Sequence, residues 1–167
     1  MKPELRLGMA AIVVFAIGTL VYVVDRRPDH VYFLPEYLSF VHDSERLFGR
    51  LGDHLPTFAH VYAFILLTKV VNPASRALPV CAFWFGVDVL FEIGQSGAVA
   101  PILAELIGTR LDGIPILENS AAYFLGGSFD WYDVLSIAIG ALAAWVTLSN
   151  YKESNHGIQY ESGQSLA

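Results

Sequence analysis

Four stretches of the chain are long enough and apolar enough to cross a lipid bilayer. The hydrocarbon core of a bilayer is about 30 Å thick, and a helix needs about 20 predominantly apolar residues to span it. The pattern therefore predicts an all-α polytopic membrane protein, a bundle of four transmembrane helices with two longer loops on one side. The predicted helices cover residues 8–24, 55–71, 78–95 and 131–149.

The segments between the predicted helices differ in length and character. Residues 25–54 mix charges with aromatic side chains, which is typical of a piece lying in the membrane interface. Residues 96–130 contain an apolar run too short to span, so we expect a re-entrant or surface-lying piece there. The connection over residues 72–77 is short and makes the second and third helices an antiparallel hairpin. Pro56 is expected in the first turn of the second helix, where its missing N–H is tolerated.

The two ends of the chain have different predicted roles. The first apolar stretch is longer than the apolar region of a signal peptide, and no small-residue cleavage motif follows Val24. It is therefore predicted to be an uncleaved membrane anchor. Residues 1–150 are predicted to form one transmembrane domain, and residues 151–167 a polar, flexible tail.

The orientation in the membrane depends on where the basic residues lie. With four helices, both termini and the tight turn share one side. The positive-inside rule weights residues close to helix ends more than residues in long loops, and this favours both termini in the cytoplasm. The side with the termini carries Lys2, Arg6, Lys69, Arg76 and Lys152, and the long-loop side carries Arg26, Arg27, Arg46, Arg50 and Arg110.

Composition supports a membrane protein and excludes several other classes. Of the 167 residues, 54% are hydrophobic and 16% are charged, with a mean hydropathy of +0.49, whereas a typical soluble domain has about 25% charged residues. A net charge of −6 without a basic patch argues against nucleic acid as a partner. The single cysteine, Cys81, excludes a disulfide scaffold. The expected partner is the lipid bilayer, and the sequence is also compatible with a homo-oligomer.

Polar residues inside the predicted helices mark the candidate functional site. Ionisable residues in spanning helices are energetically expensive and usually face a bundle interior or a water-filled cavity. The topology places six polar residues, five of them ionisable, in the half of the membrane next to the long loops. Four carboxylates there need protons, a histidine cation or a bound metal, so a metal is left open and no cofactor is assigned. The six are His60, Asp88, Glu92, Gln95, Asp130 and Asp133. His54, beside the predicted start of the second helix, is a further candidate for this cluster.

Each of these residues also has a purely structural interpretation. Asp130 and Asp133 open a helix, where carboxylates suit the free N–H groups. Glu92 and Gln95 could be solvated at the membrane interface, and His60 could be a hydrogen-bonded packing residue.

A stripe of small residues in the fourth helix predicts close helix packing. Ser136, Gly140 and Ala144 recur at steps of four residues, which lets two helix backbones approach each other. Asp133 lies about one turn before Ser136, so the packing face leads to the carboxylate. The stripe could face this bundle or another chain.

The third and fourth helices resemble the VanZ-like family of small bacterial membrane proteins. The resemblance rests on Glu92-x-x-Gln95, on Phe129-Asp130-x-x-Asp133-Val134, and on Gly140, with the run around His60 similar to an earlier helix of the family. Two positions depart from the family pattern: Gly127-Ser128 stands where an arginine is usual, and Ile137 where an asparagine is usual. The family is associated with resistance to glycopeptide antibiotics such as teicoplanin. The resemblance implies a role in the cell envelope and no defined reaction.

Four kinds of function remain compatible with the sequence. The favoured one is a cell-envelope or antibiotic-resistance accessory protein that binds a lipid-linked or envelope ligand at the carboxylate and histidine cluster. A membrane enzyme acting on a lipid-linked substrate is less favoured, because the chain has no HExxH or GxSxG motif. The third is proton- or cation-linked transport, and the fourth is a structural subunit of a membrane complex.

Overall fold

The computed structural model describes the backbone of residues 3–25, 46–110 and 120–164, and the side chains of residues 4–25, 46–107 and 121–151. The described chain contains six helices and no strand. Four of these helices are long and apolar enough to cross a membrane, which confirms the predicted fold class. These are α1 (Pro3–Asp25), α2 (Leu51–Val71), α3 (Ala77–Gly94) and α6 (Trp131–Gln164), whereas α4 (Ala100–Arg110) and α5 (Ser120–Gly126) are short.

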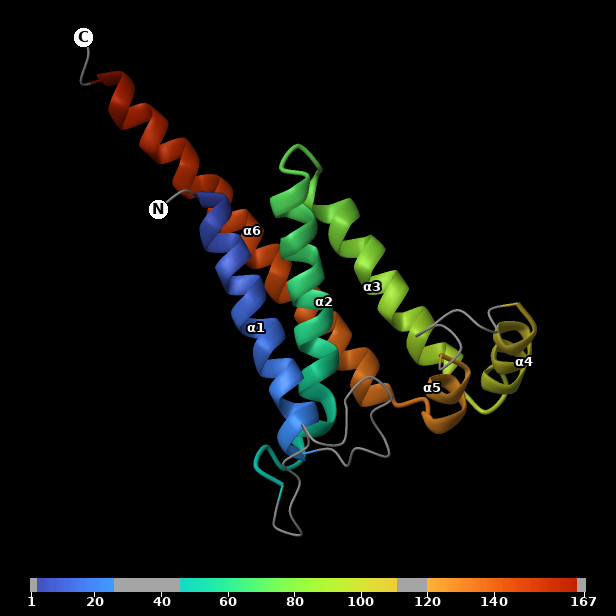
Figure 1. Ribbon diagram of the computed structural model, residues 1–167. Helices are drawn as coiled ribbons and strands as arrows, with labels where there is room; N and C mark the ends of the chain where they lie inside the picture. The colour runs from blue at the N-terminus through green and yellow to red at the C-terminus, as the bar shows by residue number, and fades with distance from the viewer. Residues whose placement is uncertain (1–2, 26–45, 111–119, 165–167) are drawn as a thin grey trace.

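Helix α2 is the centre of the bundle. It packs against α1, α3 and α6, and α6 also contacts α3. Figure 1 shows the four long helices alternating in direction, with both termini and the tight turn between α2 and α3 at one end. The end of α1 and the start of α2, together with α4 and α5, lie toward the other end. The start of α1, the end of α6 and the tight turn therefore lie at the same end of the bundle.

Close helix packing depends on small residues at two contacts of α2. A Cβ at position 140 would lie 2.5 Å from Val61 Cγ1 and 2.8 Å from the Phe58 carbonyl oxygen. The backbone of α6 at Gly140 therefore packs directly against α2. Ala144 on the same stripe is fully buried. The small-residue stripe therefore packs against α2 of the same chain. Gly18 of α1 makes a similar contact with Ala59.

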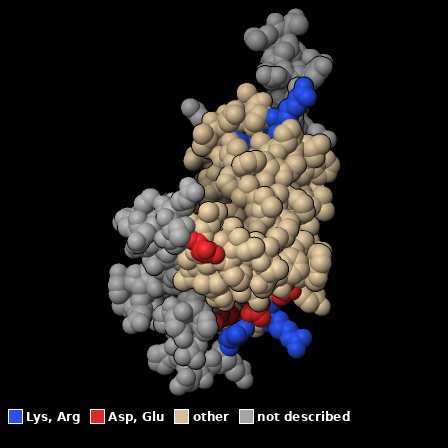
Figure 2. Space-filling view, turned by 90° about the vertical axis from the view of Figure 1, so that its right-hand side faces the viewer, with Lys and Arg blue, Asp and Glu red and all other residues tan. Residues whose placement is uncertain are grey.

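The outer surface of the bundle has the character expected of a lipid-facing surface. Large apolar side chains on α1, α3 and α6 are more than half exposed, among them Ile12, Leu90 and Leu142. Figure 2 shows a broad uncharged band on one face, with most of the coloured charged side chains gathered above and below it. Charges at both ends and an apolar middle are what a membrane-spanning bundle requires.

The start of α2 differs from the prediction, because α2 begins at Leu51 instead of about residue 55. The reason is a contact between distant parts of the chain. Asp25, the last residue of α1, accepts hydrogen bonds from the backbone N–H groups of Leu47 (2.7 Å) and Phe48 (2.8 Å). These bonds hold the turn that precedes α2. Pro56 consequently lies inside the helix and not in its first turn.

The tight hairpin between α2 and α3 is closed by a lysine. Lys69 is buried, and its ammonium group donates hydrogen bonds to the carbonyl oxygens of Pro73 (2.7 Å) and Ser75. An ammonium near a helix C-terminus also complements the free carbonyl groups there.

The part of the chain after residue 149 also differs from the prediction. The fourth predicted helix ended at residue 149, whereas the backbone of α6 is helical to Gln164, and the flexibility expected from residue 151 stays a prediction. No proline interrupts this segment, so nothing in the backbone forces the helix to end at the bilayer. The short apolar run after α3 forms α4, which packs against α5. The expected interfacial piece within residues 25–54 lies largely outside the described residues.

Candidate functional site

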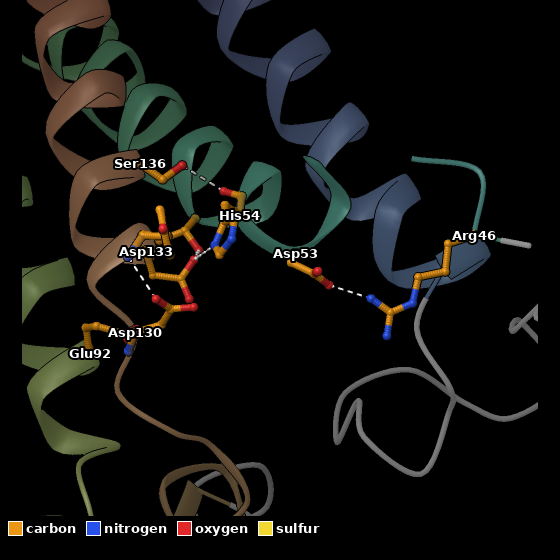
Figure 3. Close-up of polar contacts among 9 residues, drawn as sticks. Arg46, Asp53, His54, Glu92, Asp130, Asp133 and Ser136 are labelled. Carbon is orange, nitrogen blue, oxygen red and sulfur yellow. Dashed lines mark hydrogen bonds and ion pairs between the residues drawn. The ribbon is translucent and has the colours of Figure 1, made fainter. Parts of the chain in front are cut away.

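The first turns of α2 and α6 and the last turn of α3 meet at the long-loop end of the bundle. This follows from the alternation of the helices, since α2 and α6 begin where α3 ends. Four ionisable side chains meet there and are called the mouth cluster (Figure 3). They are His54 of α2, Glu92 of α3, Asp130 just before α6, and Asp133 of α6.

His54 and Asp133 form the centre of the mouth cluster. The distance between His54 Nδ1 and Asp133 Oδ1 is 2.9 Å, and the two side chains are 30% and 20% exposed. The Thr57 hydroxyl donates a hydrogen bond to the same carboxylate oxygen, at 3.1 Å. The spacing of three residues explains why His54 and Thr57 share this face of α2. Ser136 Oγ donates to the His54 carbonyl oxygen at 2.9 Å, which ties the first turn of α2 to α6.

Asp130 and Glu92 fix the start of α6. Asp130 Oδ1 accepts a hydrogen bond from the Tyr132 N–H at 2.8 Å, as an N-capping residue does. The Asp130 N–H donates in turn to Glu92 Oε1 at 2.6 Å. Glu92 is only 5% exposed although it is a carboxylic acid. The expected structural role of Asp130 is therefore present, and a buried carboxylate from a third helix lies against it.

The mouth cluster brings three carboxyl groups together with one histidine. Glu92 lies near enough to His54, Asp130 and Asp133 to interact with them electrostatically. Within the described part of the chain, no lysine or arginine forms an ion pair with these three carboxylates. Arg46, which lies at the same end, pairs with Asp53 instead, at 2.7 Å (Figure 3). Three carboxylates with one histidine need protons or a cation to offset their repulsion.

His60 and Asp88 form a second polar pair, between α2 and α3. His60 Nδ1 lies 3.1 Å from both carboxylate oxygens of Asp88, which is 6% exposed. The His60 ring packs against Phe64 (4.3 Å between centroids) and lies near Trp84. Because α2 begins at Leu51, His60 lies about 14 Å along the helix from its start. No described hydrogen bond joins this pair to the mouth cluster, so the six predicted residues do not form a single cluster.

Gln95 belongs to neither group. Helix α3 ends at Gly94, and the Gln95 side chain donates a hydrogen bond to the Tyr123 hydroxyl of α5 at 2.9 Å. It thus holds α5 against the end of α3. The predicted third helix ran to residue 95, whereas Gln95 is the residue that follows the last helical residue of α3.

His54 and Thr57 are the residues at this site for which the sequence provides the weakest indication. A helix expected to begin at residue 55 leaves His54 outside the bundle. The four-residue earlier start of α2 brings His54 onto the face that meets α6. The available signal was the position of His54 three residues before Thr57.

Comparison with known proteins adds no assignment. The chain matches no protein-family model, and no curated protein or solved structure is significantly similar to it. What the site can do is therefore argued from its chemistry: a half-buried, anionic group of one imidazole and three carboxylates suits a cationic ligand.

Proposed function

We propose that this chain is a multi-pass membrane protein of the bacterial cell envelope that binds a positively charged ligand at the mouth cluster. The observation that carries the proposal is the convergence of three carboxylates on one histidine, where helices α2, α3 and α6 meet. A positive group bound there offsets the repulsion between Glu92, Asp130 and Asp133. The partial exposure of His54 and Asp133 leaves the cluster open to a ligand.

The resemblance to the VanZ-like family supports the envelope part of the proposal. Glu92, Asp130 and Asp133, which carry much of that resemblance, are three of the four members of the mouth cluster. The class of ligand that fits is a cation, either free or carried by a lipid-linked precursor or another envelope component. A hydrolase acting on a lipid phosphate fits less well, since the described cluster offers no arginine or lysine to hold the phosphate.

Antibiotic susceptibility tests the proposal in a living cell. The wild-type chain and the Asp133→Asn variant are expressed in a teicoplanin-sensitive bacterium, and growth is compared over a range of teicoplanin concentrations. Asp133→Asn removes the charge and keeps the size of the side chain. Asp53→Asn is the matched control, because Asp53 is an exposed carboxylate on the same turn of α2 that pairs with Arg46 outside the mouth cluster.

The expected result is that the wild type and Asp53→Asn protect the cells, while Asp133→Asn loses at least half of the protection at equal membrane abundance. The absence of protection by the wild type would reject the envelope role in antibiotic resistance. Equal protection by all three chains would reject the mouth cluster as the functional site.

A further inference from the structure

Three of the four residues in the mouth cluster have the geometry of a metal-binding group. His54, Asp130 and Asp133 each offer one ligand atom, and these atoms all lie within 4.8 Å of one another. Ligand atoms bound to one zinc ion at about 2.1 Å lie about 3.4 Å apart in a tetrahedral site. All three residues are partly exposed, and their side chains would move closer together on binding a metal ion.

The hydrogen bond between His54 and Asp133 brings two potential metal-ligand atoms close together. The 2.9 Å contact joins an imidazole nitrogen to a carboxylate oxygen, and a metal ion can take the place of the shared proton. Thr57 donates to the same carboxylate, and Ser136 holds the backbone of His54. Outer hydrogen bonds of this kind orient metal ligands and raise affinity for the metal.

An independent observation from α3 points to a cation at this place. Glu92 is 5% exposed, and its only described hydrogen bond is from the Asp130 N–H to Oε1. An ionised Glu92 would lie buried near the two aspartates, with His54 and no described lysine or arginine to offset its charge. Burying an uncompensated carboxylate is costly, and a divalent ion beside Asp130 and Asp133 would offset that cost.

We propose that His54, Asp130 and Asp133 bind one divalent transition-metal ion, such as Zn²⁺ or Mn²⁺, at the mouth of the bundle. The donor set of one imidazole and two carboxylates suits these ions better than Ca²⁺, which prefers oxygen ligands alone. Three protein ligands leave a coordination position open to water or to a negatively charged or neutral ligand group. The inference deepens the proposed function by naming the cation, and it rests on that proposal only in using the same cluster.

Metal titration of the purified full-length chain tests the inference. The protein is extracted in detergent, stripped with a chelator, and titrated separately with Zn²⁺, Mn²⁺ and Ca²⁺ in a calorimeter. The wild type is expected to bind one Zn²⁺ or Mn²⁺ per chain, and Ca²⁺ at least tenfold more weakly. His54→Ala and Asp130→Asn are expected to bind at least tenfold more weakly than the wild type. Asp53→Asn alters a carboxylate next to the three proposed ligands, and its metal affinity should match that of the wild type.

A thermal measurement guards against variants that fail to fold. Asn is also a good N-capping residue, so Asp130→Asn should keep the start of α6 intact. A metal that binds only the folded state raises the melting temperature, and Zn²⁺ or Mn²⁺ should do so for the wild type and for Asp53→Asn but not for Asp130→Asn. No metal binding by the wild type, or equal binding by all variants, would overturn the inference. Metal binding without teicoplanin protection would reject the proposed function alone, and protection without metal binding would reject the inference alone.

Discussion

At the scale of single residues, His60 and Asp88 show how a polar pair is accommodated inside an apolar bundle. Asp88 is 6% exposed, whereas the His60 side chain is 44% exposed, so the two partners do not depend equally on their contact. Leaving a buried hydrogen-bonding group unsatisfied costs about 1–3 kcal/mol, whereas replacing both partners by apolar groups can be nearly neutral.

These magnitudes predict the outcome of a double-mutant cycle. His60→Leu should lower stability more than Asp88→Leu, because it leaves the more deeply buried carboxylate without its partner. The double variant should be more stable than His60→Leu alone. Thermal unfolding of the four proteins in one detergent measures the coupling between the two sites. Strictly additive losses would mean that the contact contributes nothing to stability.

The same scale explains what the sequence could and could not predict of the site. Glu92, Asp130 and Asp133 were predictable, since polar residues at helix ends on one side of a bundle must lie near each other. His54 was only a marginal candidate, because the start of α2 depends on the capping of residues 47 and 48 by Asp25. That contact joins residues more than twenty positions apart, and no local sequence pattern predicts it. Gln95 lies apart from the mouth cluster because its side chain binds Tyr123 of α5, another contact that no local sequence pattern indicates.

At the scale of helices, the α2–α6 contact depends on the absence of a side chain at Gly140. A Cβ there would meet the Phe58 carbonyl oxygen at 2.8 Å, and a backbone atom cannot move aside without shifting α2. Gly140→Ala should therefore destabilise the protein by about 1–3 kcal/mol, the usual effect of overpacking.

A second glycine provides the control for this prediction. A Cβ added at Gly86 of α3 would meet no heavy atom within 4 Å, so Gly86→Ala should be neutral or slightly stabilising through helix propensity. Thermal unfolding in detergent, followed by circular dichroism, separates the two variants. A Gly140→Ala protein as stable as Gly86→Ala would contradict the close approach of α2 and α6.

Prediction of the helices succeeded where hydrophobicity alone decides and was less complete elsewhere. All four long helices were expected, since a bilayer demands about 20 apolar residues and the chain has four such runs. The length of α6 was not predicted, because its polar last turns carry no hydrophobic signal. The small-residue stripe predicted packing, and the contacts of Gly140 with Val61 and of Ser136 with the His54 carbonyl oxygen show that α2 is the partner.

At the scale of the whole molecule, the distribution of basic residues predicts the direction in which the protein inserts into the membrane. Both termini and the tight turn lie at one end, and α4, α5 and the mouth cluster lie toward the other. Lys69 and Arg76 flank the tight turn closely, which favours that end in the cytoplasm. The mouth cluster would then face the outside of the cell, where an envelope ligand is available.

Cysteine labelling measures this orientation directly. Ala74 in the tight turn and Ser128 before α6 are both exposed, and the single native cysteine, Cys81, is buried. In a Cys81→Ala background, a membrane-impermeant maleimide added to intact cells should label Ser128→Cys and not Ala74→Cys, while both should react after the membrane is opened. Labelling of Ala74→Cys alone would invert the orientation and place the mouth cluster in the cytoplasm, away from any external ligand. Labelling of both positions in intact cells would contradict the membrane-spanning arrangement itself. Positions 74 and 128 would then lie on the same side of the membrane, although α3 between them is expected to cross it.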